Sequence, residues 1–142
     1  MLYLNKITYE ELVKHIYDYC NENMVKPDEV DSFLDNTKLD LLTLYFKSTP
    51  GKYVLKKSGT IEKFDDEKLF LSIGSASDEI DEPLTRGDIH NIVNKALHDF
   101  TQDETGIIPT KLIRKKVLDA LLELGFPDVY KRYRDHNPYL VD

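Results

Sequence analysis

The sequence predicts an α+β fold that is mainly α: a helical bundle carrying a small β-hairpin or three-stranded sheet, preceded by a two-helix N-terminal extension. Three observations support this prediction. Apolar residues recur at helical spacing along most of the chain. A glycine separates two short β-compatible runs within residues 53–64. A Thr-Pro-Gly linker at 49–51 separates the first two helical stretches from the rest, so we expect an extension at 1–49, a domain at 53–136 and a tail at 137–142.

The N-terminal extension begins with a helix signal. Thr8 followed by Glu11 is a capping-box pattern, and apolar residues then recur on one helical face as far as Cys20. Because the cysteine lies on that face, we expect a buried, unreactive thiol. A second helix is predicted from about Asp28 to Phe46. Its apolar residues exceed a single stripe, so we expect burial on more than one face, against the rest of the chain or a second copy.

Residues 53–64 predict a β-hairpin, since Gly59 accepts the positive φ of a tight turn. Asp65 precedes an apolar-periodic run and predicts the N-cap of a helix whose first turn holds Lys68. If Ser58 and Gly59 form a two-residue turn, side chains alternate strictly on either side of it. Each face then has four residues: Leu55, Lys57, Thr60 and Glu62 on one, and Val54, Lys56, Ile61 and Lys63 on the other.

The remaining elements follow from caps and periodicity. The helix after Asp65 is expected to fray at Gly74, and another is predicted over 85–100. Residues 107–109 are β-compatible and predict a third strand beside the hairpin. A helix is predicted over 110–125, with its first residue, a threonine, as N-cap and its last, a glycine, as C-terminal stop. A last helix is predicted from 127 to 137.

The amino-acid composition limits the classes of function that the chain can have. The chain of 142 residues has 26 acidic and 19 basic side chains, a formal charge of −7. This balance argues against a nucleic-acid partner, because sequence-independent binding draws on Lys and Arg. The single cysteine excludes an internal disulfide and a cysteine-based zinc site. No apolar run approaches the roughly twenty residues of a membrane span, and no signal-peptide pattern is present, so we expect a cytoplasmic protein without a membrane partner.

The sequence contains no catalytic constellation and no metal-ligating cluster. It has no Gly-rich phosphate loop, no Ser/His/Asp arrangement and no cysteine paired with a histidine, so we predict a protein that is not an enzyme. The hairpin instead combines ammonium groups, a carboxylate and a helix N-terminus. Such a group suits an anion with a polar head, such as a nucleotide. The alternative is a solvated hairpin with no ligand.

One motif resembles a known family. The run Val54-x-Lys56-Lys57-x-Gly59-x-x-Glu62-x-Phe64-Asp65-x-Glu67-Lys68 is similar to the opening of the ATP-cone domain. That domain is the nucleotide-sensing module of ribonucleotide reductase catalytic chains and the second half of the zinc-ribbon repressor of reductase genes. The similarity continues to about residue 136. This sequence departs from the usual family pattern at two positions. Lys57 stands where arginine is usual, so a rigid bidentate guanidinium is replaced by a single ammonium charge. Ser58 stands where the turn usually has an aspartate.

The resemblance implies a nucleotide site for ATP or dATP, with or without Mg²⁺. The ammonium groups of Lys56, Lys57 and Lys68 would contact the phosphates. Glu62 and Asp65 would contact the base or sugar, either directly or by holding Lys57 and the start of the helix. Thr110 and Arg114, on a later helix, would close the far side of the site.

The resemblance also implies how the protein would act. It implies a non-catalytic regulator that works through nucleotide-dependent self-association or through a reductase-related partner. The alternative is a degenerate cone, a protein-interaction adaptor that binds no nucleotide. A transcriptional regulator is disfavoured by the acidic charge and by the missing zinc-ribbon cysteines.

Overall fold

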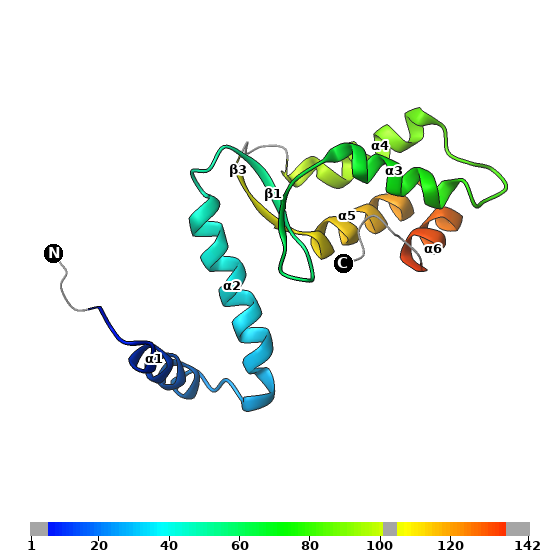
Figure 1. The fold of residues 1–142 in the computed structure, drawn as a ribbon. Coiled ribbons are helices and arrows are strands. Elements are labelled where there is room, and N and C mark those ends of the chain that lie inside the picture. Colours follow the sequence, from blue (N-terminus) through cyan, green and yellow to red (C-terminus); the bar gives the residue numbers. More distant parts are fainter. Residues whose placement is uncertain (1–5, 101–104, 136–142) are drawn as a thin grey trace. The chain divides into compact units, whose positions relative to one another are not determined.

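A computed structural model describes residues 6–100 and 105–135. By internal contacts the chain forms two units, residues 1–42 and 43–142, and each is described by itself. The helices α1–α6 and the strands β1 and β3 are labelled in Figure 1. The predicted fold class is confirmed, because helices dominate and the strands form one small sheet. The predicted tail at 137–142 and the end of the last predicted helix lie outside the described residues.

The first unit contains α1 (Tyr9–Glu22), the 3₁₀ turn η1 (Pro27–Glu29) and most of α2 (Val30–Phe46). The predicted capping box is confirmed. The Thr8 hydroxyl accepts from the Glu11 amide at 3.1 Å, and the Glu11 carboxylate accepts from the Thr8 amide at 3.1 Å. These hydrogen bonds lower the pKa of Glu11. Cys20 is buried, as predicted.

Helix α2 has a broad apolar surface, for which we predicted burial on more than one face, against the rest of the chain or a second copy. Within this chain no residue of α2 is buried, and its pairing with a second copy stays a prediction. The helix meets α1 through the Tyr19 and Phe33 rings, whose centroids lie 5.8 Å apart. One short helix can cover only one side of another, so the rest of the apolar surface of α2 is exposed. Leu34 and Leu41 keep 46% and 52% of their accessible surface.

The second unit contains a mixed sheet and four helices. Strand β1 (Gly51–Leu55) lies between β2 (Ile61–Lys63) and β3 (Thr105–Pro109), antiparallel to β2 and parallel to β3. The predicted third strand is therefore confirmed. The helices are grouped beside the sheet in Figure 1: α3 (Asp66–Ser77), α4 (Arg86–Leu97), which continues into the 3₁₀ turn η2 (His98–Phe100), α5 (Thr110–Glu123) and α6 (Pro127–Asp135).

The hairpin exists, but its register differs from the prediction. The Gly59 amide donates to the Lys56 carbonyl and the Lys56 amide donates to the Thr60 carbonyl, both at 2.9 Å. The loop therefore holds three residues, with Gly59 at φ +95°. Val54 pairs with Glu62. Because one residue of slip moves every side chain of a strand to its other face, the predicted faces were wrong for β2.

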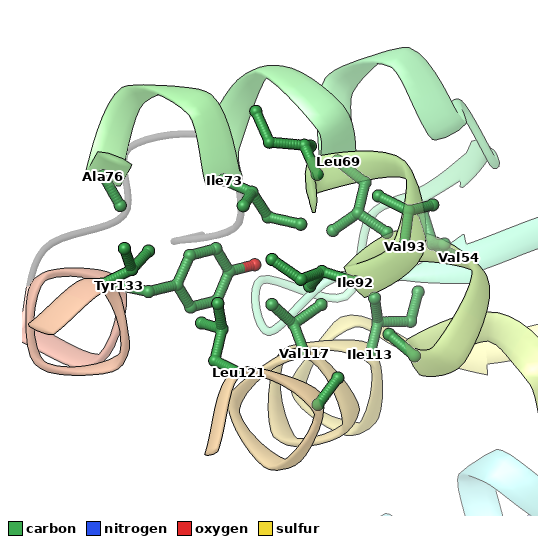
Figure 2. Packing of buried hydrophobic residues seen from close by; sticks show 14 residues of the cluster. Val54, Leu69, Ile73, Ala76, Ile92, Val93, Ile113, Val117, Leu121 and Tyr133 are labelled. Atoms are coloured by element: carbon green, nitrogen blue, oxygen red, sulfur yellow. The ribbon is translucent and has the colours of Figure 1, made fainter. Parts of the chain in front are cut away.

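The core lies between the four helices and one face of the sheet. Figure 2 shows Tyr133 of α6 directed into the space between Ile73 of α3 and Leu121 of α5, beside Ile92 of α4. All four side chains have no accessible surface, and Val54 brings the sheet into the same cluster. The core thus joins every helix of the second unit, so α3, α5 and the hairpin hold fixed positions relative to one another.

Two predicted helix ends were wrong. Helix α3 runs through Gly74 to Ser77, because buried Ile73, Ala76 and Ser77 anchor its last turn. Packing here outweighs the weak helix propensity of glycine. Thr110 is the first residue of α5 rather than its N-cap. Pro109 takes the cap position and offers no side-chain hydrogen bond.

Replacing Gly74 by alanine is expected to stabilise the fold by about 0.5–1 kcal/mol, since alanine loses less backbone entropy in a helix. The added methyl would lie 3.8 Å from Ile89 Cδ1, an ordinary contact. Thermal denaturation measures the change. Gly59→Ala is the matched control: it makes the same chemical change at a positive φ, so it should destabilise. Equal shifts for both variants would contradict this account.

Among the described residues, no helix combines the length and apolarity that a bilayer crossing requires.

Candidate functional site

A small recess lies where the hairpin meets the first turns of α3 and α5. Its walls come from β1, β2, the connection into α3 and the beginning of α5. Five of the seven predicted site residues line it: Lys56, Glu62, Asp65, Lys68 and Thr110. Val54, Lys63, Phe64, Leu69 and Ile113 complete the lining. The structure therefore brings most of the predicted residues together.

The Glu62 carboxylate is the centre of the charged part of the recess. It lies 3.4 Å from the Lys56 ammonium and 3.9 Å from that of Lys68. The actual hairpin register makes this possible, because it puts Glu62 beside Val54 and on the same face as Lys56. Two cations share one anion, so the three side chains carry one net positive charge. An incoming anion would have to compete with the Glu62 carboxylate for the two ammonium groups, or approach them from the side away from it.

The helices α3 and α5, which both begin at the recess, differ in how their first backbone amides are capped. At α3, the Asp65 carboxylate accepts from the Glu67 amide at 3.0 Å, as the predicted N-cap should. At α5, Pro109 gives no side-chain cap and the first turn has no acidic residue. The first amides of a helix have no partner within it and carry partial positive charge. The start of α5, with Thr110 buried, therefore favours an anion.

Lys57 and Arg114 do not line the recess. Lys57 lies in the exposed turn of the hairpin. The Arg114 guanidinium donates to the carbonyl of Arg134 and lies over the Tyr133 ring, 5.8 Å from its centroid. It therefore links α5 to the end of α6. The nucleotide roles expected for Lys57 and Arg114 stay predictions.

Two further cations of α5 are held by carboxylates away from the recess. Lys116 donates to Asp99 at 2.8 Å, and Lys115 lies 3.9 Å from Asp119. The hydrogen bond from Lys116 lowers the pKa of Asp99, and the same bond raises the pKa of Lys116. Lys115 and Lys116 therefore each have a carboxylate partner outside the recess.

The recess is small. Its cavity measures about 40 Å³, whereas pockets that enclose a drug-sized ligand measure about 300–1,000 Å³. A nucleotide would therefore lie across the mouth of the recess, with its phosphates over the ammonium groups, or the hairpin would have to move outward.

A larger cavity, of about 780 Å³, lies between the α3–α4 loop and the start of α6. None of the seven predicted residues lines it. Its walls carry five carboxylates and two cations: Glu79, Asp81, Glu82, Asp88 and Asp128, with Lys131 and Arg132. This excess of negative charge repels polyphosphates, so size alone does not make it the better nucleotide site.

The chain is similar to known proteins over the part that contains the recess. The family model for the ATP cone domain matches residues 52–136. A transcriptional repressor NrdR from Methylacidiphilum infernorum (isolate V4) is 29% identical over 94 residues, which are 62% of this chain and 55% of the relative. Transcriptional repressors NrdR from Anaplasma phagocytophilum (strain HZ) and Ehrlichia ruminantium (strain Gardel) are each 32% identical over 92 residues, 61% of this chain and 59% of the relative. The chain thus spans less than two thirds of these relatives.

These relatives correct one prediction. We expected no nucleic-acid partner, and that expectation is wrong, because the curated relatives are transcriptional repressors, a class of proteins that acts on DNA. The expectation came from the net charge of the whole chain. Net charge reports an average, whereas contact with DNA depends on a local basic surface, which a negative total can conceal.

Proposed function

Because the chain belongs to the ATP cone domain family, we propose that it is a non-catalytic regulatory protein that binds ATP or dATP, with or without Mg²⁺, at the recess. The proposal treats residues 53–136 as the nucleotide-binding domain and 1–49 as its extension, with a cytoplasmic location as the sequence predicts.

One observation carries the proposal: two lysines converge on a single carboxylate beside the start of α5, where Pro109 provides no side-chain cap. Lys56 and Lys68 would bind the phosphates, and the α5 amides near Thr110 would add hydrogen bonds to phosphate oxygens. Asp65 would keep α3 capped, and so keep Lys68 in place. Lys57 and Arg114 would join the site only if the hairpin turn or the Arg114 side chain moved.

Regulation would follow from a difference in affinity between two states. A ligand shifts an equilibrium only as far as it binds one state better than the other. If nucleotide binds more tightly to an associated form, or to a form that holds a reductase-related partner, its concentration sets how much of that form exists. The hairpin is the part of the recess best placed to differ between the states, because enlarging the cavity requires it to move.

Isothermal titration calorimetry with ATP, dATP and inorganic triphosphate tests the proposal. We expect saturable binding of ATP or dATP in the micromolar range, with weaker binding of triphosphate. Light scattering on the same samples reports whether binding changes the mass of the particle. The absence of heat and of a thermal shift at millimolar nucleotide would overturn the proposal and leave the adaptor, a cone that binds no nucleotide.

The Glu62→Gln variant separates two roles for this carboxylate. If Glu62 acts as the internal counter-ion of Lys56 and Lys68, removing its charge frees both lysines and should tighten triphosphate binding about two- to fivefold, the value of one exposed ion pair. If Glu62 instead accepts a hydrogen bond from the sugar or base, nucleotide binding weakens while triphosphate binding does not. Calorimetry with both ligands distinguishes the two results.

The names of the relatives favour a second candidate function, control of transcription. The curated relatives are transcriptional repressors and share the matched region with this chain. A regulator of that type would bind DNA more tightly in one nucleotide state than in the other. A gel-shift titration against promoter DNA, at one low salt concentration and with ATP, dATP or no nucleotide, tests this. If the DNA migrated equally with ATP, with dATP and without nucleotide, the result would contradict nucleotide-dependent DNA binding.

A further inference from the structure

Helix α2 presents a row of exposed residues that the proposed function does not use. Val30, Leu34, Thr37 and Leu41 follow one another at spacings of four, three and four residues. We call this row the α2 seam. All four residues are exposed. Apolar residues at an average spacing of 3.5 form the contact line of two-stranded coiled coils. The α2 seam therefore has the form of a helix-pairing surface.

Thr37 is the one polar member of the seam, and its polar atom is already satisfied. Its hydroxyl donates to the Phe33 carbonyl, one turn earlier in the same helix, at 2.7 Å. A hydroxyl paired in this way can be covered without leaving an unsatisfied group. The Thr37 methyl then faces a partner as an apolar group would, so the seam can be buried along its whole length.

We propose that the α2 seam pairs with the same seam of a second copy of the chain, antiparallel and about a two-fold axis. In this arrangement Val30 lies opposite Leu41 of the second copy, and Leu34 lies opposite Thr37 of the second copy. Two-fold symmetry repeats each contact, so a single surface is complementary to itself. A helix of 17 residues, about 25 Å long, provides all of these layers.

Charge complementarity favours the antiparallel orientation and an identical partner. Asp31 and Lys38 flank the seam on one edge, seven residues apart. Antiparallel pairing brings Asp31 beside Lys38 of the second copy, and symmetry makes this contact twice. In a parallel pair each of these residues would face the opposite edge of the seam, where α2 has Phe33 and Asp40. Within one chain, the Lys38 ammonium lies 4.0 Å from the Asp35 carboxylate on α2, a long contact that leaves room for a partner on a second copy.

Sedimentation equilibrium of the full chain in nucleotide-free buffer tests the pairing, because the seam lies outside the recess. We expect a dimer, and we expect Leu34→Lys to raise its dissociation constant at least about tenfold, since the variant buries an ammonium group at the centre of the seam. Asn36→Lys is the matched control: it adds the same cation to the same helix away from the seam, and should leave the dimer intact.

Charge reversal tests the orientation. Asp31→Lys and Lys38→Asp should each weaken the dimer, whereas an equimolar mixture of the two variants, or the double variant, should restore it. Three results would overturn the proposal: a monomeric wild type at concentrations of about 100 μM, a dimer unaffected by Leu34→Lys, or no reassociation in the mixture. A lower melting temperature of a monomer carrying Leu34→Lys would also overturn it, since the chain itself would then cover the seam.

Discussion

The Lys56→Ala/Lys68→Ala double variant is expected to bind ATP or dATP about a hundredfold more weakly than the wild type. Each lysine would lose a charge-assisted hydrogen bond to phosphate, worth about 1.5–3 kcal/mol. Two such losses give about 3 kcal/mol or more, and each 1.4 kcal/mol is a factor of ten. Both lysines meet at Glu62, so removing only one leaves a cation in place and should have a smaller effect. Calorimetry measures the change.

A matched control is available in the same unit. Lys95 lies 2.9 Å from Glu123, and Lys115 lies 3.9 Å from Asp119, so each also pairs with one carboxylate. The Lys95→Ala/Lys115→Ala variant loses the same charge and two ion pairs but leaves the recess unchanged. Its nucleotide affinity should stay within about twofold of the wild type, the effect of weak long-range electrostatics. Equal losses in both double variants would show that net charge, and not the recess, governs binding.

The Leu121→Ala variant is expected to destabilise the second unit by about 2–5 kcal/mol, because it opens a cavity where no surface is exposed. Leu121 packs near Tyr133 and Ile73, the side chains that join α5 to α6 and α3 (Figure 2). For a unit of this size, 1 kcal/mol shifts the melting temperature by about 4–8 °C. Thermal denaturation should therefore show a decrease of the melting temperature of at least about 8 °C.

Leu122→Ala is the control for this prediction. The residue is next in the same helix, removes the same atoms and keeps 50% of its accessible surface. This variant should lower the free energy of unfolding by about 1 kcal/mol or less, because little buried apolar area is lost. Similar losses for Leu121→Ala and Leu122→Ala would mean that the core is not packed as described.

Local signals in the sequence predicted the elements and most of the recess. The Thr8–Glu11 box, the Asp65 cap and the glycine of the hairpin each depend on neighbouring residues, and each is present in the structure. The hairpin side of the recess could be predicted because Lys56, Glu62, Asp65 and Lys68 come within fifteen residues of chain. Such features are determined by residues close in sequence, so a single sequence can reveal them. The expectation that Thr110 lies beside these residues came from the family resemblance.

Features that depend on distant residues were predicted less well. The hairpin register depends on whether the loop has two or three residues, and a glycine is compatible with both loop lengths. The last turn of α3 depends on packing against α4, which no pattern near Gly74 reveals. Arg114 was expected at the recess, but it bonds twenty residues away to Arg134. The acidic total charge was a poor guide to nucleic-acid partners for a related reason, since a sum over the chain does not report how the charges are distributed on the folded surface.

The bond from Arg114 has a mechanical consequence. Helix α5 begins at the recess with Thr110. One turn later, the Arg114 side chain donates a hydrogen bond to the Arg134 carbonyl in the last described turn of α6. Because Thr110 and Arg114 are only one turn apart on α5, a displacement of the first turn of α5 would also displace the donor of the hydrogen bond to Arg134. A ligand that displaced the start of α5 would therefore also change the position of the last described turn of α6.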